Sequence, residues 1–134
     1  MCVYRQASSL ALLAVLLSLC GSSVAQAQTQ SDMAASATDS ARKVTASLET
    51  AVKTYRQRLS KAQRGLFDHS QRAWEAFRKS ACEFEASGVR GGSAEGTVRT
   101  TCWETYTAQR LKRIREMAEC AEGDLSCPAF KHGT

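Results

Sequence analysis

The sequence has little of what interrupts helices, and it lacks the common signatures of strands and of enzymes. Its one proline is Pro128, close to the end of its 134 residues. No pair of alternating apolar and polar runs encloses a tight turn, so no β-hairpin is predicted. The motifs H-E-x-x-H and G-x-S-x-G and a glycine-rich phosphate loop are also missing, although many hydrolases and nucleotide-binding enzymes carry one of them. We therefore expect an all-α protein that is not an enzyme.

Metal and cofactor ligands are equally scarce. The two histidines, His69 and His132, lie at no spacing typical of a metal site, and no C-x-x-C occurs. His69 has Asp68 and Ser70 as neighbours, but adjacent residues of a helix point in different directions and cannot form a catalytic relay. We expect neither a metal nor a cofactor.

Long apolar runs are absent except near the N-terminus. Leu10–Leu19 is apolar, follows Arg5 and precedes an A-x-A motif at residues 25–27, which is the pattern of a cleaved secretory signal peptide. We expect residues 1–27 to be removed near Ala27 and the rest of the chain to be periplasmic or secreted. No later segment approaches the roughly 20 apolar residues of a membrane span.

Two alternatives to a cleaved signal peptide remain open. The apolar run could be a short membrane anchor, although it is short and wrongly flanked for a spanning helix. Leu17-Ser18-Leu19-Cys20 also resembles a lipoprotein cleavage box, with a lipid attached at Cys20. Leu19 argues against the lipoprotein because that position normally holds a small residue.

Charge of one sign is not strongly in excess. The chain has 18 Lys and Arg against 13 Asp and Glu, a net charge of +5. Lys112, Arg113 and Arg115 cluster, but Glu116 and Glu119 follow them. This alternation indicates a solvated helix face rather than a nucleic-acid patch. An exported protein would also seldom meet nucleic acid, so we expect none as a partner.

Apolar residues recur at helical spacing over the rest of the chain. Residues 28–40 are rich in Ser, Ala, Thr and Gln, and we predict a flexible lead-in there. Asp39 or Ser40 is expected to cap the helix that follows. The first apolar stripe then comprises Leu48, Val52, Tyr55 and Leu59, as in an amphipathic helix.

Two further helices are predicted, with a glycine-rich turn between them. They run from about Ser60 to Ser87, where Gly65 could break or kink the chain, and from about Thr97 to Glu122. Gly88–Gly96 forms the turn, and Gly123 suits the C-cap of the last helix. The predicted helical domain is therefore residues 41–122, followed by a tail at residues 123–134.

Four cysteines remain after the signal peptide: Cys82, Cys102, Cys120 and Cys127. An even number in a small exported domain indicates two disulfides, and a zinc site is the alternative. Hairpin geometry favours Cys82–Cys102 across the two long helices and Cys120–Cys127 in the tail. The predicted fold is thus a small three-helix assembly built on a disulfide-linked αα-hairpin.

The Cys82–Cys102 bridge also predicts the register of the hairpin. One four-residue step away from it places Arg78 level with Tyr106, and a second step places Trp74 level with Arg110. Arginine over tryptophan is a cation–π contact. We therefore assign these four residues to the interface between the two helices rather than to a ligand site.

Residues 66–111 carry a more specific pattern. It consists of Gln71, Trp74, Arg78 and Cys82, then Gly92 and Ser93, then Cys102, Thr107, Arg110 and Leu111. This pattern resembles the LprI-like lysozyme-inhibitor domain, a family of small exported bacterial helical proteins. The family usually has two more cysteines in its leading segment, where this chain has Ser36 at one position and lacks the other. The pair Cys120 and Cys127 looks like a local addition.

The resemblance implies a non-enzymatic envelope protein with lysozyme inhibition as the named activity, and it adds Gln71 to the interface residues. Many lysozymes are basic, and a positively charged protein gains no long-range steering toward them. A local acidic patch near the turn is therefore the expected contact: Glu83, Glu85, Glu95 and Glu104.

A second function class remains open beside inhibition by steric occlusion. The chain could be a general periplasmic module that binds another envelope protein or a polyanion. Such a module would use an exposed basic face built on Lys112 and Arg115, with Arg113 beside it. The sequence determines neither the partner nor the oligomeric state.

Overall fold

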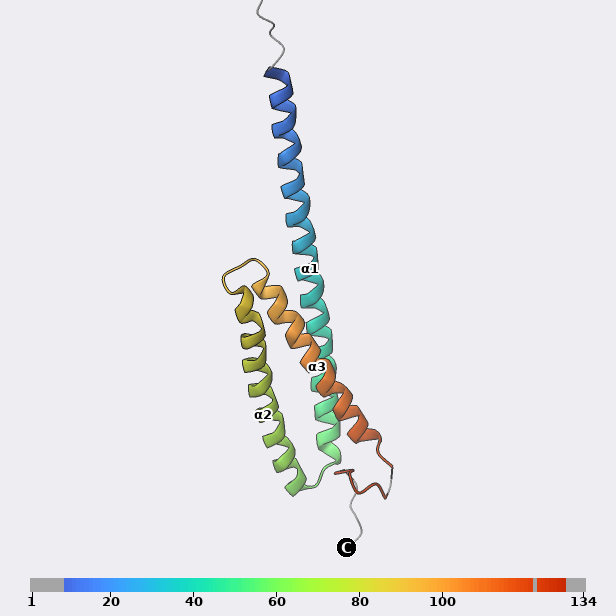
Figure 1. Cartoon of the computed structure of the whole chain (residues 1–134). Coiled ribbons are helices and arrows are strands. Elements are labelled where there is room, and N and C mark those ends of the chain that lie inside the picture. Colours follow the sequence, from blue (N-terminus) through green and yellow to red (C-terminus); the bar gives the residue numbers. More distant parts are fainter. Residues whose placement is uncertain (1–8, 122, 130–134) are drawn as a thin grey trace, which may run out of the picture. The chain divides into compact units, whose positions relative to one another are not determined.

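The computed structural model describes residues 9–121 and 123–129, with side chains from Thr29 onward. They form helices α1 (Ser9–Arg58), α2 (Lys61–Ala86) and α3 (Glu95–Glu119), with a short 3-10 turn η1 (Ser87–Val89). The chain divides into two compact units, residues 1–35 and 36–134. The second unit contains the end of α1 with α2 and α3 (Figure 1). The described residues contain no strand, so the all-α prediction is confirmed.

Helix α1 begins much earlier than the first predicted helix. Residues 28–40 are helical and not a flexible lead-in, and Asp39 forms an i,i+4 salt bridge to Lys43 (2.6 Å) instead of capping a helix. The reason is that no glycine or proline occurs between Gly21 and Gly65, while alanine, the best helix former, is frequent there. Arg5 of the predicted signal peptide lies outside the described residues.

The chain turns between α1 and α2 at Ser60, so Gly65 does not mark the break. Ser60 caps α2 reciprocally: the Gln63 backbone N–H donates to Ser60 Oγ (3.3 Å), and the Ser60 N–H donates to Gln63 Oε1 (2.9 Å). Such a capping box satisfies two donors that a helix start leaves free. Arg56 of α1 adds a bidentate pair to Asp68 of α2, with both N···O distances at 2.8 Å.

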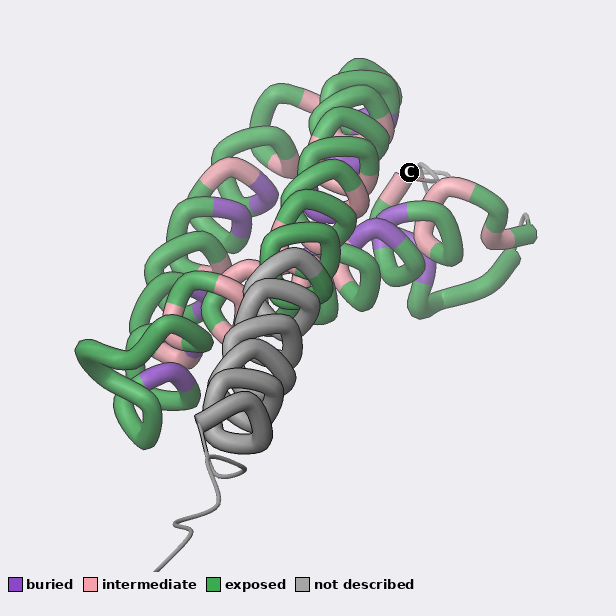
Figure 2. Tube along the Cα trace, turned by 90° about the horizontal axis from the view of Figure 1, so that it is seen from above, coloured by how far each residue is buried: buried purple, intermediate pink, exposed green. Residues whose placement is uncertain are grey.

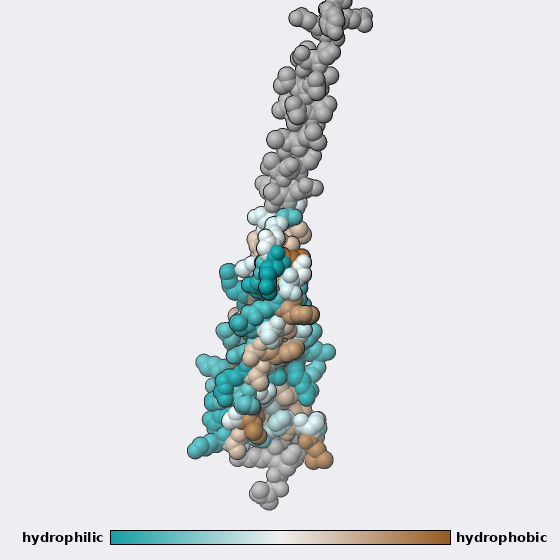
Figure 3. Space-filling view, turned by 60° about the vertical axis from the view of Figure 1, so that its left-hand side comes forward, coloured by the Kyte–Doolittle hydropathy of each residue, from teal (hydrophilic) through white to brown (hydrophobic). Residues whose placement is uncertain are grey.

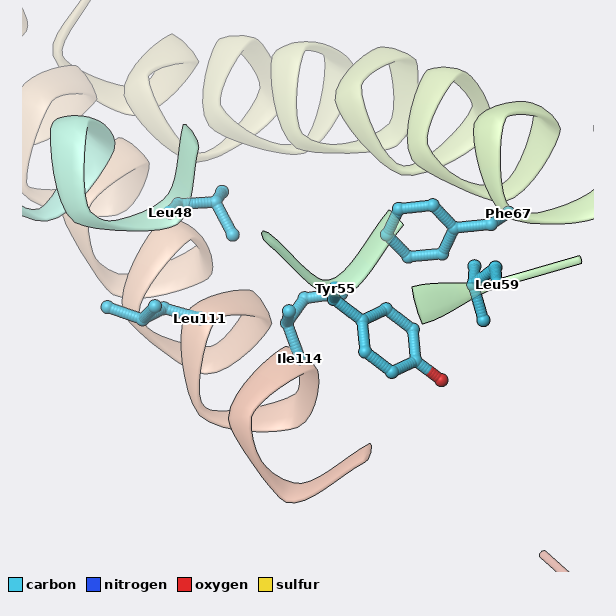
Figure 4. Packing of buried hydrophobic residues seen from close by; sticks show 6 residues of the cluster. All are labelled: Leu48, Tyr55, Leu59, Phe67, Leu111 and Ile114. Atoms are coloured by element: carbon cyan, nitrogen blue, oxygen red, sulfur yellow. The ribbon is translucent and has the colours of Figure 1, made fainter. Parts of the chain in front are cut away.

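A small apolar core joins the three helices of the second unit. Tyr55 of α1 and Ile114 of α3 are almost completely buried, and the Tyr55 ring meets Phe67 of α2 edge-on at 5.4 Å. Buried residues lie on the inward sides of the helices (Figure 2). The core cluster comprises Leu48, Tyr55, Leu59, Phe67, Leu111 and Ile114 (Figure 4). Of the predicted apolar stripe, Leu48, Tyr55 and Leu59 therefore lie in the core, and Val52 is partly buried and packs against it.

Helices α2 and α3 form the predicted antiparallel hairpin. The Cys82–Cys102 disulfide joins them with a Cα–Cα distance of 5.6 Å. The second predicted bridge, Cys120–Cys127, is also present, with a Cα–Cα distance of 5.8 Å. It alters the end of α3: the helix stops at Glu119, and the backbone becomes extended at Cys120.

The tail differs from its prediction at Gly123. With φ at 89°, Gly123 lies inside the loop that the tail disulfide closes and does not cap α3. The disulfide accounts for this because the chain must leave the helix axis at Cys120 to return to Cys127 within a short loop. Glu122, the predicted helix end, and residues 130–134 of the predicted tail, with His132, lie outside the described residues.

Candidate functional site

A buried arginine occupies the middle of the hairpin interface. The Arg78 guanidinium lies between two indoles, with Cζ 4.4 Å from the Trp74 ring centroid and 3.7 Å from that of Trp103. Its Nη1 donates to Thr107 Oγ1 at 2.7 Å. Among the described residues, no carboxylate lies within salt-bridge distance of Arg78. The two ring faces therefore supply most of the compensation for this buried charge.

Burial is also the main influence on the acid–base behaviour of Arg78. It lowers the pKa of the guanidinium, while the nearby Glu75 charge acts in the opposite direction. The group stays protonated because arginine starts far above neutral pH. Arg78 thus contributes a permanent cation to the hairpin interior, where it is only 8% exposed.

A second arginine lies one step farther from the disulfide. Arg110 Nε donates to Gln71 Oε1 at 2.6 Å, Nη2 donates to Ser70 Oγ at 3.2 Å, and Cζ lies 5.8 Å from the Trp74 ring. The structure thus brings Gln71, Trp74, Arg78 and Arg110 together along one seam. These contacts lie between α2 and α3 and hold the two helices in register.

Tyr106 lies beside this seam rather than in it. Its ring meets Phe77 edge-on at 5.4 Å, and its hydroxyl donates to Glu85 Oε1 at 3.1 Å. That hydrogen bond is the main reason that the pKa of Tyr106 is raised. The residue opposite Arg78 is instead Thr107, and Trp103 lies beside it. The sequence analysis did not place Trp103 at the interface, although its position directly after Cys102 was a signal that it faces α2.

The hairpin ends in a glycine-rich turn, residues 87–96, which we call the hairpin tip. Residues 87–94 are all exposed. Gly91 has φ at 77°, a conformation that favours glycine, and a Cβ on Gly92 would lie 3.1 Å from the Val89 carbonyl oxygen. The Gly91 N–H donates to Glu95 Oε2 at 2.8 Å. The shape of the tip therefore depends on two glycines, Gly91 and Gly92, and on a hydrogen bond to the Glu95 carboxylate.

The predicted acidic residues lie around this tip, and three of the four have partners within the chain. Glu95 binds the Gly91 N–H and also pairs with Arg99. Glu83 pairs with Lys79 at 2.8 Å, and Glu85 accepts from Tyr106. The hydrogen bond from Lys79 is the main reason that the pKa of Glu83 is lowered. Glu104, on α3, is partly exposed.

The charge around the tip is nearly balanced. Between residues 79 and 104 the chain has three cations, Lys79, Arg90 and Arg99, and four carboxylates. Arg90 is exposed, and the described residues form no salt bridge with it. The tip therefore presents one cation at its end and carboxylates on the helices behind it.

Metal-ligating side chains do not gather in the part of the chain that the structure describes. It contains no group of three His, Cys, Asp or Glu side chains that could hold a metal ion. It also contains no helix with the length and apolarity needed to cross a membrane. A groove of about 580 Å³ lies beside the tip along α3. Glu85 of α2 lines it together with these residues of α3: Thr97, Val98, Thr101, Cys102, Thr105, Tyr106 and Gln109.

Comparison with known families identifies the family of this helical hairpin. Residues 20–114 match the family model described as lysozyme inhibitor LprI. The chain belongs to the LprI family. No curated protein and no solved structure matches it. The LprI match includes the tip, the Cys82–Cys102 bridge and the arginine–tryptophan seam, whereas the tail bridge Cys120–Cys127 lies beyond it.

Proposed function

We propose that this protein inhibits a lysozyme by placing the hairpin tip in the cleft of the enzyme. Membership of the LprI family supports this activity, and the geometry of the tip supports the mode. The tip is exposed, narrow and rich in small residues, and the Cys82–Cys102 bridge holds the two helices just behind it. A preorganised loop loses little conformational entropy on binding, which favours occlusion of a cleft.

Arg90 is the group best suited to the interior of such a cleft. Glycoside hydrolases of this kind hydrolyse their substrate with a pair of carboxylic residues, so the cleft is locally acidic. Arg90 is exposed at the tip. Glu95, by contrast, is engaged with the Gly91 N–H and Arg99, so its entry would disrupt the turn. We infer that a cation rather than a carboxylate faces the catalytic residues.

The carboxylates behind the tip then have a different role. Glu83 and Glu104 lie on the two helices of the hairpin, close to the tip in sequence, and could contact the basic outer surface of a lysozyme around its cleft. This keeps the acidic residues as candidate partner contacts and moves them from the cleft to its rim. Because the charge around the tip is nearly balanced, we expect weak long-range attraction and a contact dominated by shape.

Inhibition of this kind needs neither turnover nor a cofactor, and it needs the protein to be outside the cytoplasm. We propose that residues 1–27 act as a signal peptide and that the protein acts in the periplasm or outside the cell. The two disulfides favour this location because such bonds persist in oxidising compartments.

A basic binding face is supported less well. Lys112 and Arg113 both approach Glu116, at 3.8 Å and 3.6 Å, so their charges are partly compensated. That leaves Arg115 as the least compensated of the three cations. One such cation is a weak basis for binding a polyanion, since that binding grows with the number of charges neutralised.

The test is lysis of a cell-wall suspension by several lysozymes, with the oxidised protein in stoichiometric excess. We expect lysis to slow with at least one enzyme, and Arg90→Ala to weaken inhibition at least tenfold. Arg72→Ala is the matched control because Arg72 is an exposed arginine far from the tip, and it should inhibit like the parent. Equal inhibition by both variants would remove Arg90 from the contact. No slowing with any lysozyme would contradict the function itself.

A further inference from the structure

Helix α2 has a second row of apolar residues that stays largely exposed in the described structure and touches α3 only through Phe77 and Ser70. Its core face carries the buried residues Phe67, Gln71, Arg78 and Cys82. On an adjoining side of the helix, Leu66, Phe77 and Phe84 are 74%, 53% and 79% exposed. Figure 3 shows hydrophobic side chains running in a column along the molecule between hydrophilic ones. We call the following exposed residues the outer face: Leu66, Ser70, Ala73, Phe77, Ser80 and Phe84.

The outer face is continuous and uncharged. Its members follow one another at alternating steps of four and three residues, so they form a single row on the helix. The row is about 27 Å long at a rise of 1.5 Å per residue. A row with this spacing is the seam by which helices pack side by side in coiled coils.

The positions of the row are symmetric about residue 75, so the row can pair with a second copy of itself in the antiparallel direction. Leu66 and Phe84 lie equally far from position 75 along the chain, as do Ser70 and Ser80, and Ala73 and Phe77. If two α2 helices pack antiparallel with their centres at position 75, each residue of the row meets its counterpart on the other copy. Phe77 then meets the small Ala73, Ser70 meets Ser80, and Leu66 meets Phe84.

From this self-complementary row we propose that two copies of the protein associate through the outer face of α2, antiparallel and with twofold symmetry. A twofold contact requires a surface that matches itself. The contact lies outside the hairpin tip, and it places the two tips at opposite ends of the dimer.

The exposed area is of the size that a weak dimer needs. The three large side chains of the outer face leave about 350 Å² exposed in each copy, if each buries roughly 150–250 Å² when fully covered. The smaller residues of the row and its flanks add to this. Standard interfaces use about 800 Å² per partner, so we expect dissociation in the micromolar range.

Charge and rigidity favour the same contact. An uncharged face brings no like charges together, even though the chain is positive overall. At its edge, His69 of one copy comes almost level with Glu83 of the other, and an imidazole can donate to a carboxylate. Phe77 is already held by its edge-on contact with Tyr106, so little side-chain freedom is lost on association.

Sedimentation equilibrium of the oxidised protein, from about 1 to 300 µM, tests the proposal. We expect a monomer–dimer equilibrium that Leu66→Lys and Phe84→Glu each weaken at least tenfold. The double variant Leu66→Lys/Phe84→Glu should recover at least tenfold over either single change, because each new ammonium group faces a new carboxylate of the other copy. Leu125→Glu is the matched control, since Leu125 is 87% exposed outside α2, and it should dimerise like the parent.

Far-UV circular dichroism must show that every variant keeps its helices, which is expected because all the changed positions are exposed. A monomer at all concentrations would overturn the proposal. A dimer that neither single variant weakens would also overturn it, as would a double variant that recovers nothing. A monomeric parent whose lysozyme inhibition falls in the single variants would reassign the outer face to the enzyme and would overturn the dimer.

Discussion

Replacing Arg78 tests the central claim about the hairpin, namely that two indole faces and one hydroxyl hold a buried cation. The residue is only 8% exposed and packs on Trp74 and Trp103. Each cation–π contact contributes about 2 kcal/mol at this degree of burial. The hydrogen bond to Thr107 adds about 1.5 kcal/mol because its donor is charged.

Two effects reduce the cost of removing Arg78. The charge no longer has to be desolvated, which returns roughly 3 kcal/mol. Thr107 also keeps a partner, because its hydroxyl donates to the Trp103 carbonyl at 2.6 Å. We therefore expect Arg78→Ala to lower the free energy of unfolding by about 3 kcal/mol, which includes a small cavity contribution.

Two further substitutions separate charge from packing. Arg78→Met keeps most of the volume without the charge and should cost about 1 kcal/mol, because replacing a buried charge by a well-packed apolar group is often nearly neutral. Arg78→Lys keeps the charge but loses the flat group between the rings, and it should cost about 2 kcal/mol. Urea unfolding followed by circular dichroism measures all three. A loss below about 0.5 kcal/mol for Arg78→Ala, or a lysine variant as stable as the parent, would refute the reasoning.

Three other predictions follow from features already described. The double variant Cys82→Ser/Cys102→Ser should lose about 3 kcal/mol in thermal unfolding, since the bridge closes a long loop, and a melting temperature like that of the parent would contradict this. The pKa of Asp68 is lowered mainly by the hydrogen bond from Arg56. The ionised Asp68 therefore stabilises the fold above its unfolded pKa of about 3.9, and this stabilisation is lost as the pH falls through its folded pKa. The stability difference between the parent and Asp68→Asn should therefore shrink on acidification from pH 5, and a constant difference would exclude this linkage. Glu104→Lys should weaken lysozyme inhibition and make it less sensitive to salt without changing helicity, and an unchanged salt response would remove Glu104 from the contact.

The sequence was sufficient for the number of helices, the two disulfides and the level of most residues in the hairpin, because all three depend on spacing along the chain. A disulfide fixes how far two helices are shifted, but it leaves their rotation about their own axes less certain. For this reason Trp74 was correctly placed level with Arg110, whereas Arg78 was matched with Tyr106 and not with Thr107 and Trp103. The rotation depends on packing around the whole interface, which no local pattern encodes.

Other differences have a related origin. The length of α1 could not be predicted because a capping residue such as Asp39 marks a helix start only when the preceding residues favour another conformation. The nearly balanced charge at the tip was visible in the sequence as Arg90 and Arg99. Only the fold shows that Glu95 is occupied by its own turn.

The two indoles that enclose Arg78 also give the molecule a local optical probe. Trp74 and Trp103 are the only tryptophans in the chain, and both contact the same guanidinium. Tryptophan fluorescence, excited where tyrosine does not absorb, therefore reports on the α2–α3 seam, while circular dichroism reports on every helix. Unfolding curves from the two signals will coincide only if the seam and the apolar core around Ile114 are lost in one cooperative step.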